Sequence, residues 1–568
     1  MRSGTLSTTK YDRREGRWQR RWAALRGVGG LRIVAAGLGG LAVFGGFAPS
    51  TLWWLPTIGF ALLSLAIRGT GWRAAAGLGV VFGCLMFLPL LSWAGIYVGA
   101  TPWVALAILE AILVAPATVL MSVASRLLPL WPIWAACAWV AGETLRAVFP
   151  FGGFPWGGVA FTQANGPLLP LVAVVGESGL TFAVVLVGLG LGELLRLGGV
   201  SLRRNGLRRS SSDDASHNMY DGVRGSRWPA LTVWVMIGAI LVPFAGGLAA
   251  LPAVQTGAGA PTAPIAVIQG NVPEPGLEFN ARRRAVLDMH AAETAKLAGA
   301  IASGKVPQPR LVLWPENSSD IDPYTNADAA AVIDKAAKEV GVPILVGAVT
   351  SAGRPGYVYN KGIVWDPVTG PGQTYTKRHP VPFGEYVPWR PFFRFLSSKV
   401  DLVHADFLPG TRPGNLDING VPIGDLICFE IVEDDLVRDV VNGGAQVLVV
   451  QTNNATFGYT NETYQQQAMS RVRAVEYGRE VLIASTSGVS AVIRPNGSVE
   501  TTIGLFTAGF TVPEVPLMSV TTPGTVLGAP IRWALTVVCP LLLAGAFMLS
   551  RRNKQGSGPH RPAEGNNP

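Results

Sequence analysis

Long runs of apolar residues alternate with short polar connections through the first half of the chain and appear once more near its end. A helix that crosses a bilayer needs about 20 mostly apolar residues, and eight segments approach that length. We therefore predict a bundle of about eight transmembrane helices, over residues 31–48, 51–67, 74–95, 102–123, 130–148, 168–195, 229–251 and 526–550.

Residues 264–515 follow another pattern, in which β-branched runs alternate with segments that repeat apolar residues at helical spacing. Strands that alternate with helices indicate a layered α/β domain. Most acidic residues lie here, so we predict one water-soluble domain inserted before the last span. The other predicted parts are a basic N-terminal segment (1–30), a seven-helix transmembrane region (31–251) with a flexible loop (199–227), a linker (252–263), the last span (526–550) and a disordered tail (551–568).

Positive charge is concentrated in the segments that flank alternate spans. Cytoplasmic loops carry an excess of Lys and Arg, whereas loops 96–101 and 149–167 contain neither residue. We therefore predict that both termini are cytoplasmic and that the domain at 264–515 lies outside the cytoplasm. The basic segments are residues 1–30, 68–73, the loop near Arg126, residues 196–227 and the tail after 551.

The composition, with 49% apolar and only 14% charged residues, departs from that of a soluble enzyme. The net charge of +10 would suit nucleic acid, but the basic residues flank apolar spans, so we predict no such partner. The five histidines show no paired ligand spacing, and one thiol in the soluble domain cannot build a closed zinc site. Neither a GxSxG nor a GxxxxGK[ST] motif occurs. We expect no metal and no cofactor.

Three residues with complementary chemistry stand at the ends of predicted strands. Cys428 ends the run IGDLIC and precedes a helical pattern, a turn that presents a nucleophile at the edge of a sheet. Glu316 ends LVLWPE, and Lys377 ends QTYTK. Attack by a thiol needs a base and a cation that stabilises developing negative charge. Taken singly, Cys428 could be a buried free thiol and the other two could form a surface ion pair; together they predict a catalytic site.

The sequence around these residues resembles the nitrilase, or carbon–nitrogen hydrolase, superfamily, whose triad is Glu, Lys and Cys in that order on an αββα sandwich. The matching segments are LWPEN, TKRHPVPFGEYVP and ICFE. Together with the spans, and with PFGGFPWG at residues 150–157, the whole chain resembles the bacterial apolipoprotein N-acyltransferase family. It departs from that family's pattern at residues 453–458 (NNATFG) and at Phe429, where many relatives have tyrosine.

The resemblance implies ping-pong acyl transfer through a thioester. Glu316 would accept the thiol proton, Cys428 would attack a phospholipid ester, and Lys377 with a backbone N–H near Phe429 would stabilise the oxyanion. The acceptor would be the α-amino group of the diacylglyceryl-cysteine of an apolipoprotein, and the location a bacterial plasma (inner) membrane, whose lipid bilayer is part of the reaction. Two further carboxylates would orient the lysine and the amine, or form ordinary ion pairs, namely Glu385 and Glu430.

Segment 385–408 carries many large apolar side chains in what otherwise has the pattern of a loop. We predict a lid that dips into lipid, with Arg390 and Arg394 near head groups; the alternative is a segment folded back as core. The lid residues are Tyr386, Trp389, Phe392 and Phe393.

Ionisable residues are few inside the predicted spans. Glu143 and Arg146 lie one helical turn apart, so we predict that they pair. An ion pair inside the bundle fits these residues better than a proton pathway does.

Three other functions remain open. A membrane-tethered amidase that hydrolyses small amides would keep the triad but leave the spans and the lid unexplained. A transporter with a regulatory domain would need repeated halves, which the spans do not show. A catalytically inactive scaffold, which would bind an envelope glycosyltransferase, would not need an intact triad.

Overall fold

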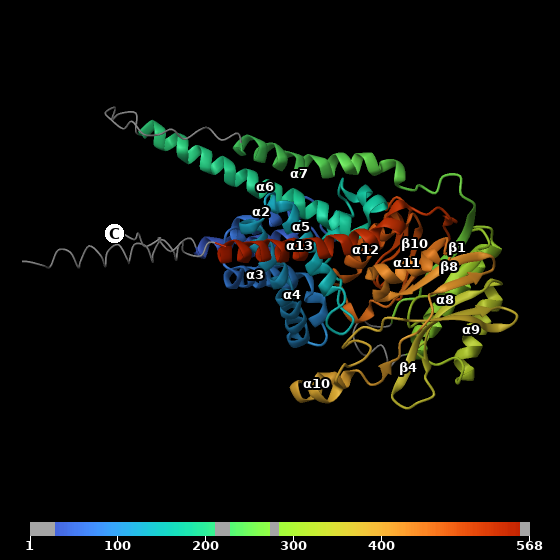
Figure 1. The fold of residues 1–568 in the computed structure, drawn as a ribbon. Helices are drawn as coiled ribbons and strands as arrows, with labels where there is room; N and C mark the ends of the chain where they lie inside the picture. Colours follow the sequence, from blue (N-terminus) through green and yellow to red (C-terminus); the bar gives the residue numbers. More distant parts are fainter. Residues whose placement is uncertain (1–28, 211–227, 273–282, 557–568) are drawn as a thin grey trace, which may run out of the picture.

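The computed structural model describes residues 29–210, 228–272 and 283–556, which form a helical bundle joined to an α/β domain (Figure 1). A helix occupies each of the eight predicted positions. Five of these helices are long and apolar enough to cross a membrane, over Trp72–Leu90, Ala100–Leu127, Leu169–Gly199, Leu231–Ala253 and Pro523–Gly545. The helices are Gly29–Phe44, α2 (Leu55–Ile67), α3 (Trp72–Leu90), α4 (Ala100–Leu127), α5 (Trp131–Arg146), α6 (Val172–Ser210), α7 (Trp228–Ala250) and α13 (Pro523–Gly556).

The bundle differs from the sequence prediction in two ways. The helix Gly29–Phe44, α2 (13 residues) and α5 (16 residues) are shorter than the about 20 residues that cross a bilayer, so the count of eight spans is not established. In addition, α6 continues to Ser210 and α13 to Gly556, so helix replaces the start of the loop predicted from residue 199 and of the tail predicted from 551. The predicted segment 1–30, apart from Gly29 and Gly30, lies outside the described residues, as do 211–227 and 557–568.

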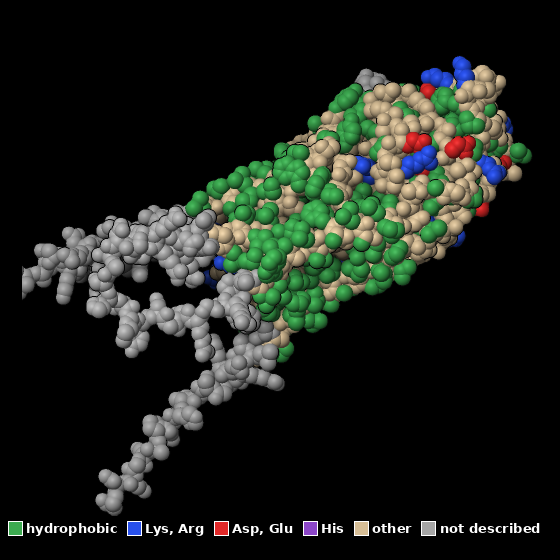
Figure 2. All heavy atoms as spheres, turned by 90° about the horizontal axis from the view of Figure 1, so that it is seen from above, with side chains coloured by type: hydrophobic (Ala, Val, Ile, Leu, Met, Phe, Trp, Pro, Cys, Tyr) green, Lys and Arg blue, Asp and Glu red, His purple; other side chains and the backbone are tan. Residues whose placement is uncertain are grey.

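The outer surface of the bundle is apolar. Figure 2 shows hydrophobic side chains covering it, while the charged side chains gather at the far end of the molecule. Ile112 on α4, Val242 on α7 and Leu541 on α13 are 50%, 68% and 67% exposed. Exposed apolar area of this extent is unfavourable in water and is typical of a surface that faces lipid. The chain is therefore a membrane protein.

A buried ion pair lies in the bundle interior, but its partners differ from those predicted. Arg146 pairs with Glu110 of the neighbouring helix α4 at 2.5 Å, and both side chains are at most 3% exposed. Glu143 instead accepts hydrogen bonds from the Trp139 indole and the Thr181 hydroxyl, each at 3.0 Å. The predicted Glu143–Arg146 pair is thus wrong, because Arg146 extends to a second helix instead of along its own.

The α/β domain contains two sheets. The first has the strand order β13-β1-β2-β3-β4-β5, with β14 beside β1 and β6 beside β4, and the second has the order β12-β11-β10-β9-β8-β7. The strands are β1 (Thr262–Gln269), β2 (Leu311–Leu313), β3 (Ile344–Ser351), β4 (Tyr357–Asp366), β5 (Gly370–Thr376), β6 (Asp406–Phe407), β7 (Asn415–Ile418), β8 (Val421–Ile427), β9 (Val447–Thr452), β10 (Glu480–Ser485), β11 (Ser490–Ile493), β12 (Val499–Ile503), β13 (Gly509–Thr511) and β14 (Glu514–Pro516).

The two sheets stack face to face with helices on both outer sides. Alternation along β1 sends Ile265 and Val267 into the core between the sheets, and Ala266 and Ile268 into the core beneath the helices of the first sheet. The order of layers is therefore αββα, the nitrilase-like sandwich that was predicted. The covering helices are α8 (Arg283–Ala302) and α9 (Ala327–Val340) on one side, and α11 (Asp434–Asn442) and α12 (Glu462–Tyr477) on the other.

The domain and the bundle share one apolar core. Val432 and Val472 belong to the same buried cluster as the membrane helices. At its edge Gln465 of α12 accepts hydrogen bonds from the indole nitrogens of Trp93 and Trp156, at 3.1 and 2.7 Å. Burying this much apolar surface fixes the α/β domain against the bundle.

Candidate active site

The three predicted catalytic residues follow strands of both sheets. Glu316 lies three residues after β2, Lys377 directly follows β5, and Cys428 directly follows β8. Because the two sheets stack, these strand ends meet at one edge of the sandwich. The expected convergence of the three side chains therefore follows from the topology.

Lys377 forms the centre of a buried charge cluster. Its Nζ lies 3.3 Å from Oε1 of Glu316 and 2.9 Å from Oε2 of Glu385. The amide of Asn360 donates to both carboxylates, at 2.7 and 3.0 Å, and the backbone N–H of Asn453 donates to Oε2 of Glu316 at 2.9 Å. The cluster is rigid, since each charged group has at least two partners.

Burial and charge act against each other in this cluster. Burial raises the pKa of Glu316, the charge of Lys377 lowers it, and the charge of Glu385 raises it again; the net direction is upward. Burial lowers the pKa of Lys377, but the carboxylates of Glu316 and Glu385 outweigh burial and raise it. Lys377 therefore remains a cation at neutral pH, and Glu316 is a stronger proton acceptor than an exposed glutamate.

Cys428 stands at a strained turn. Its φ is +56°, in the left-handed region that non-glycine residues rarely adopt. The half-buried thiol accepts a hydrogen bond from the Thr452 hydroxyl at 3.4 Å, and the Gln466 amide lies 3.9 Å away. This conformation separates β8, which ends at Ile427, from the short helix that begins at Cys428.

Electrostatics favour a neutral thiol in the resting site. Burial, followed by the charge of Glu316, raises the pKa of Cys428, and Lys377 lowers it only in part. Lys377 and Glu316 are thus both within electrostatic reach of the sulfur. For such a protonated thiol to act as a nucleophile, a base has to take its proton as the sulfur attacks.

Glu430 holds the nucleophile turn and the lysine loop together. It is fully buried and accepts from the backbone N–H of Ile427 (2.8 Å), Arg378 (2.7 Å) and His379 (3.1 Å), and from the Tyr375 hydroxyl (2.9 Å). Burial raises its pKa although these donors and Lys377 lower it. The carboxylate thus joins the turn at Cys428 to the residues that follow Lys377, and at 0% exposure it is closed to solvent.

An aromatic stack joins the nucleophile to the bundle. The ring of Phe429 stacks on Phe154 and Trp156, with centroid distances of 5.4 and 6.1 Å. Both partners belong to the PFGGFPWG loop that connects membrane helices α5 and α6. Cys428 therefore lies beside the membrane part of the chain.

The segment predicted as a lid contains the helix α10 (Arg390–Leu396). Trp389 and Phe392 are 71% and 55% exposed, so they are not core residues. Phe393 and Trp389 make edge contacts with Phe151 of the loop between α5 and α6, and the Tyr386 hydroxyl donates to the Phe151 carbonyl at 3.3 Å. The segment thus projects beside the bundle, as Figure 1 shows.

The two arginines of this segment have acidic partners within it. Arg394 pairs with Asp401 at 3.2 Å, and Arg390 pairs with Asp406 while donating to the carbonyls of Val400 and Val403 at 3.1 Å. Their charges stabilise the fold of the segment. A role toward lipid head groups would have to compete with these partners.

Several polar residues around the site were not predicted from the sequence. Asn360 bridges the carboxylates, Thr452 contacts the sulfur, and Glu462 is buried nearby with its pKa raised by burial to about 8. Glu462 accepts from Asn454 at 2.6 Å, within the segment that departs from the family pattern. A polar residue in an otherwise apolar strand, such as Asn360 in β4, is the signal that could have identified this shell.

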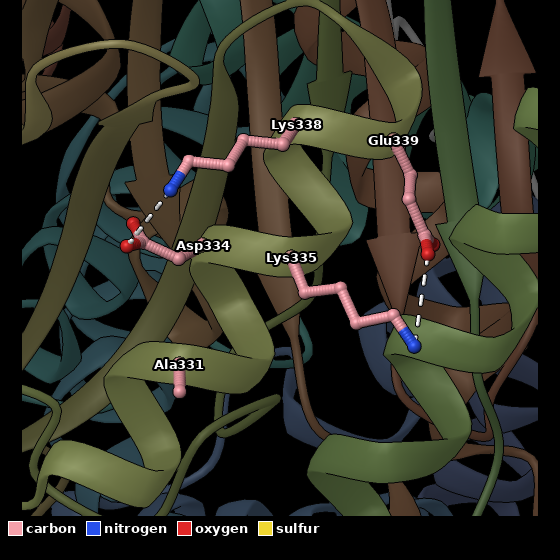
Figure 3. A pocket seen from close by; sticks show the side chains of 5 residues that line it. All are labelled: Ala331, Asp334, Lys335, Lys338 and Glu339. Atoms are coloured by element: carbon pink, nitrogen blue, oxygen red, sulfur yellow. Dashed lines mark ion pairs between the residues drawn. The ribbon is translucent and has the colours of Figure 1, made fainter.

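The outer face of α9 offers no comparable chemistry. A shallow hollow on the outer face of α9 is lined by two ion pairs, Lys335–Glu339 and Lys338–Asp334, at 3.7 and 3.6 Å (Figure 3). It contains no nucleophile. Among residues 29–210, 228–272 and 283–556, no three His, Cys, Asp or Glu side chains gather as metal ligands.

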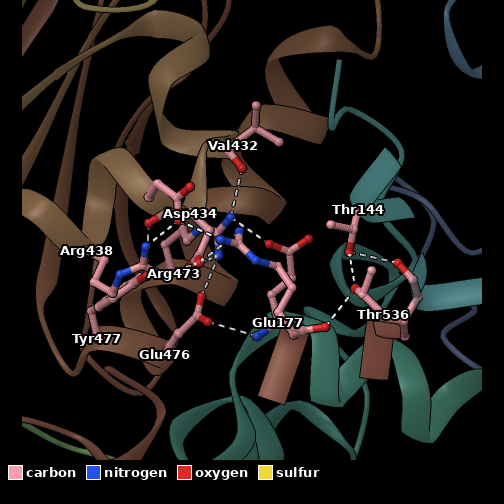
Figure 4. Close-up of polar contacts among 12 residues, drawn as sticks. Thr144, Glu177, Val432, Asp434, Arg438, Arg473, Glu476, Tyr477 and Thr536 are labelled. Atoms are coloured by element: carbon pink, nitrogen blue, oxygen red, sulfur yellow. Dashed lines mark hydrogen bonds and ion pairs between the residues drawn. The ribbon is translucent and has the colours of Figure 1, made fainter. Parts of the chain in front are cut away.

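A second buried charge cluster lies where the domain meets the bundle (Figure 4). Arg473 of α12 is fully buried and contacts Glu177 of α6 at 2.7 Å and Glu476 at 2.5 Å. It also donates to the carbonyls of Ile431 and Val432 at 3.2 and 2.8 Å. Both carbonyls belong to the short helix that begins at Cys428, so one arginine links a membrane helix to the nucleophile turn.

A nitrilase-like domain fixed to an apolar helical bundle, with a cysteine at their junction, defines a membrane enzyme of the carbon–nitrogen hydrolase class. Two families match: residues 39–190 match the apolipoprotein N-acyltransferase N-terminal domain, and residues 265–522 match carbon–nitrogen hydrolase. The chain belongs to the apolipoprotein N-acyltransferase family.

Sequence identity to curated relatives supports this assignment. The chain is 41% identical to the apolipoprotein N-acyltransferase of Mycolicibacterium smegmatis, over 94% of this chain and 88% of that protein. It is 30% identical to the Azotobacter vinelandii apolipoprotein N-acyltransferase, over 95% of this chain and 99% of that protein. Similar solved structures include an amidase from Nesterenkonia sp., which is 20% identical in sequence. The match covers 45% of this chain and 91% of the amidase chain, with a TM-score of 0.33. The family assignment does not depend on that structure.

Proposed function

We propose that the chain transfers an acyl group from a phospholipid to the N-terminal amine of a diacylglyceryl-apolipoprotein, with Cys428 as the covalent carrier. The family assignment supports acyl transfer to apolipoproteins. The observation that carries the residue roles is the buried Glu316–Lys377–Glu385 cluster within electrostatic reach of Cys428. No cofactor is needed for this chemistry.

In the first half-reaction, Glu316 accepts the thiol proton while Sγ of Cys428 attacks the ester carbonyl of the donor. The carbon–oxygen bond then breaks, Glu316 returns the proton to the departing oxygen, and a lysophospholipid leaves. Lys377 and a backbone N–H near Phe429 stabilise the oxyanion; one such donor typically contributes about 3 kcal/mol. The product is a thioester on Cys428.

In the second half-reaction, the neutral α-amine of the acceptor attacks the thioester carbon. Glu316 takes a proton from the nitrogen, the carbon–sulfur bond breaks, and the proton returns to the thiol. The new bond is an amide, and the free enzyme is restored. Glu385 holds Lys377 in place at 2.9 Å in both steps, and Glu430 supports the loop that carries the lysine.

We also propose eight membrane spans in a bacterial inner membrane, with both termini in the cytoplasm and the domain at 264–515 outside it. The eight helices and the absence of Lys and Arg from loops 96–101 and 149–167 support this topology. The segment around α10 would lie on the lipid surface, where Trp389 and Phe392 would contact the donor. An envelope glycosyltransferase partner has no support from the relatives and is not proposed.

The test is the mass of lipoprotein N-termini in cells that lack this chain. We expect only diacylated N-termini, with the third acyl chain restored by the wild type and not by Cys428→Ala. Cys84→Ala, which removes a half-buried thiol of α3, is the matched control and should restore acylation. Triacylated N-termini without the chain or a paralogue would exclude this function, and release of ammonia from small amides would favour the amidase.

A further inference from the structure

An open cavity with both polar and apolar side chains in its wall lies next to the turn that carries Glu316. It has a volume of about 690 Å³ and lies between residues 320–326 and the hairpin that joins β3 to β4. Its lining includes Arg283, Asp320, Thr350, Arg354 and Tyr357. No step of the proposed transfer uses these side chains.

Two buried side chains in the cavity wall have unused hydrogen-bonding capacity. Asp320 and Thr350 are 7% and 2% exposed, and within the described part of the chain neither Oδ2 of Asp320 nor Oγ1 of Thr350 has a partner. A buried polar atom without a partner is unfavourable. Both atoms accept hydrogen bonds, so the wall is suited to a ligand that brings N–H donors.

The cavity is connected to the catalytic carboxylate by a short hydrogen-bonded path. Asn317 donates to Oδ1 of Asp320 at 2.5 Å and accepts from the Asn453 amide at 3.4 Å. The backbone N–H of Asn453 donates to Glu316. A polymeric substrate that reacts beside Glu316 and extends toward the cavity would therefore reach Asp320 within a few of its residues.

We propose that this cavity binds the polypeptide of the acceptor, just after its modified cysteine. The inference rests on the proposed function and names where its second substrate is held. Backbone N–H groups of an extended peptide supply the donors that Asp320 and Thr350 lack, and the exposed side chains of Arg283 and Arg354 can donate to its carbonyls or acidic side chains.

A polypeptide fits this position better than a lipid head group. Figure 1 shows β4 on the side of α10 that faces away from the membrane helices. A head group stays at the bilayer surface because its acyl chains remain in the hydrocarbon, whereas the chain of a lipoprotein must continue into water. Only the acceptor has a part that extends so far from the lipid.

The charge of Asp320 makes the binding sensitive to pH. Burial raises its pKa to about 6, against Asn317 and Arg283, which lower it. Among neighbouring charges, Arg283 lowers this pKa and Glu316 raises it, and Asp322 and Arg354 line the same cavity. A carboxylate accepts N–H donors better than a carboxylic acid does, so acceptor binding should weaken as the pH falls through about 6.

The experiment separates the half-reactions in full-length protein reconstituted in phospholipid nanodiscs. Acceptors are synthetic diacylglyceryl-cysteine peptides with one or six residues after the cysteine. For Asp320→Asn and Thr350→Val, we expect KM for the long acceptor to rise about tenfold, the effect of losing one or two hydrogen bonds. KM for the short acceptor and the rate of Cys428 acylation should stay within about twofold of the wild-type values. The control Glu339→Gln, on the outer face of α9, should leave both KM values and the acylation rate within the same limit.

Each other outcome has a defined meaning. Equal KM changes for the short and long acceptors, or unchanged KM for both, would overturn the peptide site. A parallel loss of Cys428 acylation would show that the variants damage the catalytic cluster, which also contradicts the proposal. Failure of the wild type to acylate Cys428 at all would instead reject the proposed function. Thr350→Val keeps the side-chain shape and the Asn317–Asp320 contact, so it decides the question if Asp320→Asn does not fold.

Discussion

The guanidinium of Arg473 lies 2.7 Å from the carboxylate of Glu177, although Arg473 belongs to the catalytic domain and Glu177 to the membrane helix α6. The same guanidinium donates to two carbonyls of the short helix that begins at Cys428. The backbone N–H of Glu177 also donates to Glu476 at 2.8 Å, next to Gly176, whose φ of +71° interrupts α6. This ion pair thus helps to fix the turn at Cys428 against the bundle, together with the stacking of Phe429 on Phe154 and Trp156.

Removing the charge of Glu177 should disturb the nucleophile without removing any reacting group. We expect Glu177→Gln to lower the free energy of unfolding by about 1–3 kcal/mol, because Arg473 loses one of its buried partners. Acylation of Cys428 from bilayer phospholipid should fall more than its alkylation by a small water-soluble reagent. The control, Glu193→Gln, removes a buried carboxylate at another part of the same helix. If Glu193→Gln lowers the ratio of the acylation rate to the alkylation rate as much as Glu177→Gln does, the effect is not specific to the link between Glu177 and Cys428.

The loss of activity at acidic pH should follow the protonation of Glu316. The net pKa of this carboxyl is raised, so the base form is present above that pKa and is lost as the pH falls through it. Glu385 contributes to the upward shift, and Glu385→Gln should therefore move the acidic limb of Cys428 acylation to lower pH. Because Lys377 loses its 2.9 Å partner, we also expect the maximal rate to fall about tenfold to a hundredfold.

Glu480→Gln is the matched control for this pH profile. Glu480 is a buried carboxyl of the same domain whose pKa burial raises to about 7, and its partner is Arg494 at 3.1 Å. It should leave the acidic limb in place even if it reduces stability. An identical shift in both variants would mean that the limb reports folding and not Glu316.

The exposed aromatic residues beside α10 should matter for lipid in a bilayer. Replacing Trp389 and Phe392 by serine should lower the initial rate with phospholipid vesicles about tenfold, because two large apolar groups no longer contact the interface. The rate with donor dispersed in detergent micelles should change little. Val368→Ser, at an 88% exposed position in the turn after β4, is the control; equal effects of the two changes would argue against a lipid-contacting role.

Much of the fold could be predicted because its signals are local. Continuous apolar runs identify membrane helices, and β-branched runs such as Ile423–Ile427 identify buried strands. Short strands such as β13 and β14 have three residues each and contain too little periodicity to be recognised. The lid segment was expected to be a loop because α10 is only seven residues long.

The convergence of Glu316, Lys377 and Cys428 could be predicted because each residue follows a strand, whereas the residues that support them depend on tertiary packing. Asn360 reaches Glu316 and Glu385 only because β4 lies between β3 and β5. Arg146 was assigned to Glu143 from spacing along one helix, but its partner Glu110 comes from the neighbouring helix. Contacts between elements cannot be derived from periodicity alone.

The most direct test is the covalent state of Cys428 in enzyme incubated with phospholipid and no acceptor. After rapid acid quenching and proteolysis, mass spectrometry should find one acyl chain on the peptide that contains Cys428 in the wild type and in Cys84→Ala. That mass should be absent from Glu316→Gln, and it should disappear from the wild type when a diacylglyceryl-peptide is added. An acyl group on another residue, or undiminished transfer by Cys428→Ala, would contradict the account.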